Sequence, residues 1–385
     1  MTSILSPEHQ EDFLRRGFSR RNFGRLASVI AAGAALPFYN EAALAQMSKR
    51  GGPIPPDAVR LNANESPWGP FPVAADAVRN VAANGGRYMY EQTNEFIELL
   101  ASQEGVPASY VRAYPGSSAP LHQAVLGFCS PQKSFVAADT TYEAGGEAAK
   151  FVGAKRALVP LRKDCSHDVK ALAKADPNAG LLYLCNPNNP TGTLTPRADI
   201  EWLLENKPSG SVLLVDEAYL HIAGALPGLS VVDLVAKDKE IVVLRTFSKL
   251  YGMAGLRLGA AIARPDLLKK ITNYGDFAVP VTAVAAGITS LKAADEVPKR
   301  RRLIGGIREE TVAFLDKHNF KCTPSMSNCF MVETGRPAQQ VIDALAAQKI
   351  MIGRVFPAMP THVRVTVGTA EEMKKFQDAF LKVMA

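Results

Sequence analysis

The stretch TFSKLYGMAGLRLG, residues 246–259, says most about how this chain folds. It continues an apolar run, IVVLR at residues 241–245, which is typical of a strand buried on both faces. Lys249 comes at the end of this run, and Arg257 stands eight residues further on. Burial and a neighbouring cation both favour the neutral amine of a lysine, which can then form a Schiff base. A single lysine of this kind is more often structural, so the interpretation depends on what else the fold brings to it.

Length and composition set limits on the architecture and on the partners. The chain has 385 residues, of which 47% are hydrophobic, so it is too long for one ordinary domain and predicts two lobes. A formal net charge of +7 on this length is weak evidence for nucleic acid, and we expect none to bind. The five cysteines match no zinc or disulfide framework, so we expect no metal site.

The N-terminus has the three parts of an export signal. Arg20 and Arg21 precede Asn22-Phe23, and a moderately apolar run follows at residues 26–38. The segment ALAQ then offers a cleavage site after Ala45. This pattern resembles a twin-arginine export signal, so residues 1–45 are predicted to engage the twin-arginine translocation machinery and to direct the protein to the periplasm.

The remaining chain predicts an arm followed by two lobes. Residues 46–75 are rich in Pro, Gly and Asn and predict an extended arm. Residues 76–289 alternate helix-like segments with short continuous apolar runs, which predicts a large three-layer αβα domain with a mostly parallel sheet. Its strands are expected at residues 133–138, 155–161, 180–187, 211–219 and 240–248. A long helix then leads into a smaller α+β C-terminal domain, residues 290–385, with strands at 328–334, 350–355 and 362–368.

Ligands of such sheets bind at the carboxyl ends of the strands, and unusual residues gather there. Asp216 ends a buried strand and needs a cationic partner, which a protonated pyridine nitrogen would supply, although an aspartate can also cap the following turn. Tyr219 and Asn189 could hydrogen-bond a ring oxygen, and Tyr142 offers an aromatic face for stacking.

A second group of residues suits a phosphate. Gly116, Ser117 and Ser118 precede a helix, whose first amides and serine hydroxyls could bind an anion. Hydroxyls and a guanidinium of the opening stretch add further donors, namely those of Thr246, Ser248 and Arg257. Together with the lysine and the aspartate, these residues predict a pocket for pyridoxal 5'-phosphate.

The motifs CNPNNPTG, VDEAY and TFSKLYGMAGLRLG, in this order, resemble those of fold-type-I pyridoxal-phosphate aminotransferases of class I and II. LNANESPWGP, the pair Arg87–Tyr88 and HVRVTVGT are similar to the histidinol-phosphate aminotransferase subfamily, and the resemblance covers residues 57–380. The chain departs from the usual pattern at Ser118-Ala119, Thr140, Met89 and Trp68.

The resemblance implies a role for each matching residue. Lys249 would be the Schiff-base lysine and proton shuttle, with Asp216 and Tyr219 as further catalytic residues. The cofactor would be bound by Ser117, Ser118, Tyr142, Asn189, Asp216, Tyr219, Thr246, Ser248, Lys249 and Arg257. Tyr88 would reach the cofactor of a neighbouring subunit, which implies a homodimer with shared active sites. The substrate would contact Arg364, Arg354, Asn189 and Trp68.

The function expected from these residues is transamination. An amino group would pass from an amino acid, or from a histidinol-phosphate-like amine, to a 2-keto acid through a Schiff base on Lys249. The alternative is another pyridoxal-phosphate reaction on the same fold, such as that of a lyase, decarboxylase or racemase. Trp68 favours an aromatic or bulky substrate, but it could equally pack in a dimer interface. Cys185 is interpreted as a packing residue, and His122 as a residue of a helix face.

Overall fold

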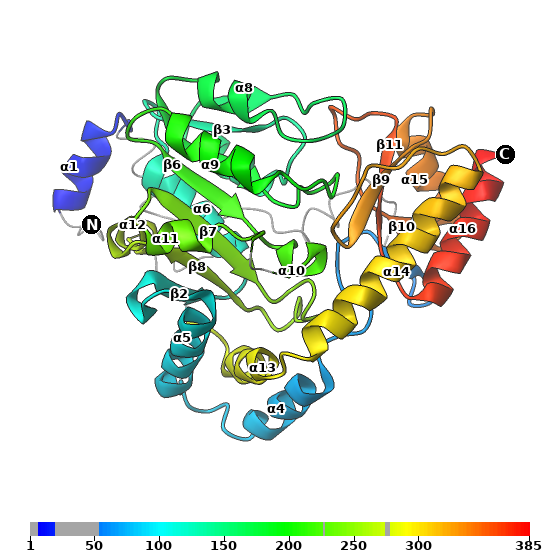
Figure 1. Cartoon of the computed structure of the whole chain (residues 1–385), viewed down its shortest axis with the longest axis horizontal. Helices are drawn as coiled ribbons and strands as arrows, with labels where there is room; N and C mark the ends of the chain where they lie inside the picture. Colours follow the sequence, from blue (N-terminus) through cyan, green and yellow to red (C-terminus); the bar gives the residue numbers. More distant parts are fainter. Residues whose placement is uncertain (1–6, 20–53, 226–227, 274–277) are drawn as a thin grey trace.

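A computed structural model describes residues 7–19, 54–225, 228–273 and 278–385 (Figure 1). The arginine pair, the apolar run and the cleavage site of the predicted export signal lie outside these ranges. The larger lobe is built on a seven-stranded sheet with strand order β2-β8-β7-β6-β5-β3-β4. Its strands are β2 (Val111–Tyr114), β3 (Ser134–Ala138), β4 (Arg156–Val159), β5 (Ala179–Cys185), β6 (Val212–Asp216), β7 (Ile241–Thr246) and β8 (Gly259–Ala263).

The central strands are parallel, and only β8 runs against both of its neighbours within this sheet. Every residue of β5, β6 and β7 is buried, which explains why these strands read as continuous apolar runs. The predicted α/β class is therefore confirmed. β2 and β8 were not among the predicted strands. The sequence of β8, GAAIA, consists mostly of small residues with low β-propensity, so it carries little strand signal.

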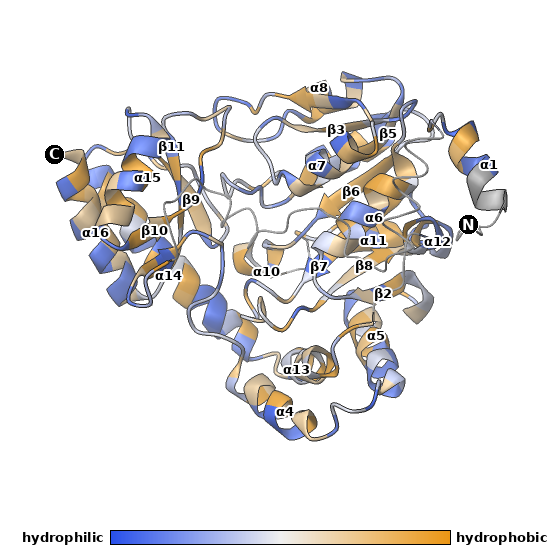
Figure 2. Cartoon of the chain, turned by 180° about the vertical axis from the view of Figure 1, so that it is seen from behind, coloured by the Kyte–Doolittle hydropathy of each residue, from blue (hydrophilic) through white to orange (hydrophobic). Residues whose placement is uncertain are grey.

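Helices flank the sheet, and Figure 2 shows apolar, orange segments along several of them; buried apolar residues of these helices belong to the core. α6 packs against α7 and α12, whereas α13 packs against α4 and α5. The helices of this lobe are α4 (Pro72–Ala82), α5 (Tyr90–Glu104), α6 (Ser118–Phe128), α7 (Ala144–Phe151), α8 (Val169–Lys174), α9 (Arg197–Asn206), α10 (Leu220–Ala223), α11 (Val232–Ala236), α12 (Pro265–Thr272) and α13 (Val281–Lys292). Within the described residues, no helix has the length and apolarity that a bilayer crossing requires.

The smaller lobe follows the long helix α14 (Glu296–Lys317), which crosses between the two lobes in Figure 1. It contains β9 (Cys329–Glu333), α15 (Ala338–Ala347), β10 (Ile350–Ile352), β11 (His362–Thr366) and α16 (Ala370–Met384). β9 and β11 pair antiparallel. The arm contributes β1 (Val59–Leu61), which pairs parallel with β10, so a segment far upstream in the chain belongs structurally to the C-terminal lobe.

The described part of the predicted signal peptide contacts the large lobe. Helix α1 (Pro7–Arg15) leads to Arg16, whose guanidinium donates to the carbonyl oxygens of Leu126 at 2.5 Å and Cys129 at 2.9 Å. These carbonyls lie at the end of α6, where a cation is favoured. Phe13 and Phe18 are both buried beside it.

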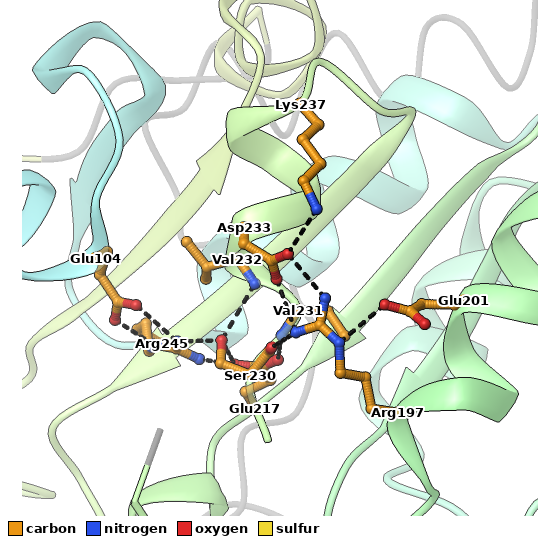
Figure 3. A network of polar contacts seen from close by, with 10 residues as sticks. All are labelled: Glu104, Arg197, Glu201, Glu217, Ser230, Val231, Val232, Asp233, Lys237 and Arg245. Carbon is orange, nitrogen blue, oxygen red and sulfur yellow. Dashed lines mark hydrogen bonds and ion pairs between the residues drawn. The ribbon is translucent and has the colours of Figure 1, made fainter. Parts of the chain in front are cut away.

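A buried ion-pair network holds the ends of β6 and β7 (Figure 3). Arg245 is 1% exposed and donates through Nε to Glu104 at 2.6 Å and through Nη1 to Glu217. Burial alone would lower the pKa of Arg245, but the two carboxylates raise it above its usual value. Glu217 directly follows Asp216, and Arg245 directly precedes Thr246. The network therefore connects the two strand ends that carry predicted site residues.

Candidate active site

A cavity of about 300 Å³ lies at the carboxyl ends of the central strands, beside the N-terminus of α6. This is the edge of the sheet that the sequence pattern indicated. The cavity is lined by ten residues that were predicted to bind the cofactor: Ser117, Ser118, Tyr142, Asn189, Asp216, Tyr219, Thr246, Ser248, Lys249 and Arg257. These residues come from segments spread over more than 140 positions of the sequence, and the fold brings them to one place.

Lys249 is buried in this cavity and is oriented by the arm. Its Nζ donates to the backbone carbonyl of Asn64 at 2.9 Å and lies 5.5 Å from the centroid of the Tyr219 ring. The Asn64 side chain donates to the Tyr219 hydroxyl at 3.0 Å and accepts from Thr366 Oγ1 at 3.0 Å. Asn64 has a φ of +50°, a conformation that asparagine tolerates better than most residues. It thus connects the lysine, the tyrosine and the small lobe.

Asp216 is held as a buried acceptor at the end of β6. It accepts hydrogen bonds from the Tyr183 hydroxyl at 3.1 Å and from the backbone amide of Ala218 at 3.2 Å. Loss of hydration in this buried position raises the pKa of the Asp216 carboxyl to about 6, and the Tyr183 hydrogen bond opposes this shift. A carboxylate in such a place is stabilised when a cationic group binds against it.

The predicted phosphate residues form an anion-binding corner. Ser117 and Ser118 stand at the N-terminus of α6, where backbone amides and the helix dipole favour negative charge. Ser248 Oγ lies 2.9 Å from Thr246 Oγ1 and 3.5 Å from Arg257 Nη1. Burial lowers the pKa of Arg257 because its charged guanidinium is partly removed from water. A bound anion would stabilise this charged form.

Two glycines allow this corner to close. Gly116 has a φ of +87°, and a Cβ atom at this position would lie 2.3 Å from Arg257 Nη2. A Cβ atom on Gly259 would lie 2.8 Å from the backbone nitrogen of Ser117. The motif glycines therefore permit the close approach of the α6 N-terminus, the arginine and strand β8.

The small lobe contacts a cavity-lining residue through Arg364. This arginine of β11 is 0% exposed, and its Nη1 donates to Asn189 Oδ1 at 2.9 Å. Its Nη2 donates to the carbonyl oxygen of Asn62 in the arm at 2.7 Å. A buried guanidinium beside a cavity-lining asparagine is placed to bind a carboxylate.

Besides Arg364, three residues predicted to take part do not line the cavity of the single chain. Tyr88 is 74% exposed, and its ring stacks on Tyr90 with centroids 5.7 Å apart. Trp68 lies in the arm, where the guanidinium of Arg300 sits 5.7 Å from its ring. Arg354 is buried and forms an ion pair with a carboxylate of the large lobe.

Other residues at the site were missed or were interpreted only as packing. Asn64 and Tyr183 were not predicted, although Asn64 stands in the motif LNANESPWGP and was therefore within reach of sequence analysis. Tyr183 sits inside an apolar strand and carries no separate signal. Cys185 lines the cavity, and burial raises the pKa of its thiol. His122 is buried in α6, which lowers the pKa of its imidazole to about 3.

The residues present fit pyridoxal phosphate. The desolvated carboxyl of Asp216 suits a pyridinium nitrogen, the corner at Ser117 and Arg257 suits a phosphate, and the buried Lys249 amine suits an aldehyde. When bound, the cofactor supplies an aldehyde that condenses with amines and a ring that takes up the electrons released at the substrate Cα. The protein's part is to place Lys249 where its amine can accept a proton and return it.

Comparison with known proteins agrees with this fit. The model of the family "Aminotransferase class I and II" matches residues 56–380. The histidinol-phosphate aminotransferase of Symbiobacterium thermophilum is 35% identical over 84% of this chain and 90% of its own length. An aromatic amino acid aminotransferase of Rhodococcus jostii is 32% identical over 85% of this chain and 89% of its own. The crystal structure of histidinol-phosphate aminotransferase from Sinorhizobium meliloti with pyridoxal 5'-phosphate superposes with a TM-score of 0.80, at 26% identity, over 91% of this chain and 95% of that one.

The chain belongs to the class I and II aminotransferase family. It is a pyridoxal-phosphate-dependent aminotransferase, which moves an amino group to a 2-keto acid.

The raised pKa of Asp216 predicts a pH-dependent stability of the cofactor-free protein. Because the acid is weaker in the folded chain, its ionisation disfavours folding by about 3 kcal/mol above pH 6, and this cost disappears as the pH falls below 4. Asp216→Asn should therefore raise the melting temperature of the cofactor-free protein at pH 8 but not at pH 4.

The added cofactor should have the opposite preference and stabilise the wild-type protein more. Pyridoxal phosphate should raise the melting temperature of the wild-type protein at pH 8 by more than that of Asp216→Asn, because only the carboxylate pairs with a pyridinium. The matched control is Asp176→Asn, which changes a carboxylate that lies away from the cavity and pairs with Lys155. Equal cofactor stabilisation of the wild type and of Asp216→Asn would contradict the assigned partner of Asp216.

Proposed function

We propose that this aminotransferase acts on amino acids with aromatic or other bulky side chains and binds the substrate carboxylate through Arg364. The observation that carries the proposal is the position of Arg364, buried and hydrogen-bonded to Asn189 at the cavity edge. A guanidinium recognises a carboxylate through two parallel hydrogen bonds. The relatives support two donor classes, since they include both aromatic amino acid and histidinol-phosphate aminotransferases.

The contacts of the site indicate a role for each residue in the reaction. The carbonyl of Asn64 holds the Lys249 amine near the cavity, where it can move a proton at the substrate Cα. Tyr219, oriented by the Asn64 amide, can donate a hydrogen bond into the cavity. Asp216, when ionised, stabilises positive charge at the ring nitrogen of the cofactor. Arg364 fixes the carboxylate and hence the orientation of the Cα–H bond.

The donor can be identified by single-turnover absorbance of the holoenzyme without keto acid. Phenylalanine, tyrosine, glutamate and histidinol phosphate would be added singly, and formation of pyridoxamine phosphate followed. An aromatic amino acid should react with the highest kcat/KM. Arg364→Gln should lower kcat/KM for amino acids by about 100-fold or more, because a buried carboxylate loses its charged partner.

Lys249→Ala should abolish turnover while the protein still binds the cofactor non-covalently, and Lys270→Ala, which changes a lysine of α12, is the control. Full activity of Lys249→Ala would contradict the mechanism. Exclusive use of histidinol phosphate would contradict the substrate class.

The proposal includes a homodimer in which Tyr88 enters the site of the neighbouring subunit. Tyr88 and Tyr90 are large aromatic residues that are more than 60% exposed in the single chain, and such residues are enriched in interfaces. The test is subunit complementation. Tyr88→Ala and Lys249→Ala should each be impaired as homodimers, and mixing them with subunit exchange should restore up to about a quarter of wild-type activity if sites are shared. No recovery in mixtures shown to contain heterodimers would argue against a shared site.

The proposal also includes export by the twin-arginine route, for which the support is the order of Arg20-Arg21, the apolar run and the ALAQ segment. A reporter fused to residues 1–50 should reach the periplasm of cells with a working pathway. Changing both arginines of the pair to lysine should keep it inside. A reporter that stays in the cytoplasm in both cases would overturn this part.

A further inference from the structure

A buried tyrosine contacts Asp216 without lining the cavity itself. Tyr183 belongs to β5, in which it is the one residue that carries a hydroxyl group. It is 1% exposed, and its hydroxyl donates to Asp216 Oδ2 at 3.1 Å. Asp216 is among the residues that line the cavity, whereas Tyr183 is not. Any effect of Tyr183 on a bound ligand therefore passes through the aspartate.

The register of the sheet brings the two side chains within reach of each other. β5 and β6 run parallel, with Cys185 paired to Asp216 and Tyr183 paired to Leu214. Side chains alternate between the two faces along a strand, so the tyrosine and the aspartate point to the same face, on a diagonal that an aromatic side chain can span. The tyrosine ring stacks on Phe135 of β3, with centroids 6.0 Å apart. This packing fixes the direction of the hydroxyl.

The two oxygens of the Asp216 carboxylate have different donors. Oδ2 accepts from the Tyr183 hydroxyl, and Oδ1 accepts from the backbone amide of Ala218 at 3.2 Å. Hydrogen bonds of this kind favour the charged form of a carboxyl group. The amide is provided by the backbone of the turn after β6, whatever side chain stands there. The hydroxyl depends on a tyrosine at one position of β5.

Other titratable groups also act on Asp216. Loss of hydration opposes its ionisation most strongly and Glu217 opposes it as well, whereas Lys249 favours it. From β5, burial raises the pKa of the Tyr183 hydroxyl and of the Cys185 thiol, so both stay protonated and the tyrosine remains a donor. With a pKa of about 6, the Asp216 carboxyl is roughly nine-tenths ionised at pH 7. A weaker acid would be protonated in a large fraction of the molecules.

We propose that Tyr183 is a positioning residue for transamination: its hydroxyl keeps Asp216 ionised and orients the carboxylate that would pair with the ring nitrogen of the cofactor. The ring nitrogen then keeps its proton, which is the condition under which the ring accepts electrons from the substrate Cα. Without the hydroxyl, the proton would shift from the ring nitrogen to the carboxylate, with no change in the number of protons. The inference rests on the proposed function in the pairing of Asp216 with the cofactor and is independent of the substrate class.

The first test uses the cofactor-free protein and Tyr183→Phe, which keeps the ring and removes only the hydroxyl. A hydrogen bond to a carboxylate is about twice as strong as one to a neutral group. Tyr183→Phe should therefore lower the melting temperature more at pH 8 than at pH 4. The fall of the melting temperature with rising pH should end near pH 7 instead of about pH 6, because the carboxyl becomes a weaker acid.

Asp216→Asn shows whether the aspartate causes this dependence. In the Asp216→Asn background, Tyr183→Phe should lower the melting temperature equally at pH 4 and pH 8, because the carboxyl that titrates is absent. An equal loss at both pH values in the presence of Asp216 would make Tyr183 a packing residue and overturn the inference.

The second test observes the cofactor in the holoenzyme. NMR spectroscopy with an isotopically labelled ring nitrogen distinguishes the protonated from the unprotonated ring. At pH 8 the wild-type enzyme should hold a protonated nitrogen, and Tyr183→Phe should lose this proton in a measurable fraction of the molecules. With the amino donor that reacts best, kcat should fall by about tenfold and KM should change by less than about threefold, because the loss concerns the ring rather than donor binding.

Tyr110→Phe is the matched control. The Tyr110 hydroxyl donates to Asp238 Oδ1 at 2.6 Å, so the same two residue types form the hydrogen bond, but they do so at the exposed surface. Neither residue lines the cavity. The substitution should leave the pH profile, the signal of the ring nitrogen and kcat unchanged.

The outcomes separate this inference from the assigned role of Asp216. Loss of the ring proton in both Asp216→Asn and Tyr183→Phe supports both roles. Loss in Asp216→Asn alone confirms the pairing of the aspartate and overturns the role of Tyr183. A ring that stays protonated in Asp216→Asn overturns the pairing and the inference together. The identity of the amino donor changes none of these signals.

Discussion

The buried ion pairs of Arg245 are the interaction on which the site most depends. A fully buried guanidinium is costly unless it is paired, and here its carboxylate partners Glu104 and Glu217 come from a helix and from the end of a neighbouring strand. Removing one partner would leave a charge in the core, so the ends of β6 and β7 and helix α5 are kept in one arrangement. Because Asp216 and Thr246 are the chain neighbours of this network, its geometry is passed to the cavity through the backbone.

The catalytic cavity is lined by the large lobe and the arm, and the small lobe contacts lining residues from outside. Strand β1 pairs with β10, and the residues that follow it bring Asn64 to Lys249 and to Thr366 of the small lobe. Arg364 of β11 connects the small lobe to the large lobe by donating a hydrogen bond to Asn189. These contacts are hydrogen bonds between buried groups, which are costly to leave unsatisfied. The position of the Lys249 amine is thus set by three segments that are far apart in sequence.

Charge is distributed unevenly over this cavity, and the distribution accounts for the chemistry. Loss of hydration raises the pKa of the Asp216 carboxyl and lowers the pKa of the Arg257 guanidinium, so both groups favour partners of opposite charge. A pyridinium and a phosphate are such partners, and one cofactor carries both. Outside the cavity lining, Arg354 of the small lobe forms an ion pair with Glu143 of the large lobe.

The sequence by itself determined the α/β class, the reaction type and the cofactor, because local patterns and motifs indicate each of them. Continuous apolar runs predicted the buried parallel strands, and motifs at their ends contained the lysine, aspartate and hydroxyls together. Only the tertiary structure decided which residues from remote segments complete the cavity. Tyr183 stands in an apolar strand, and only the fold shows that its hydroxyl donates to Asp216. Asn64 contacts Lys249 through its backbone carbonyl, which every residue has. Glu143 precedes a helix, and only the fold shows that it pairs with Arg354. Pairings of this kind depend on long-range packing, which no local pattern encodes.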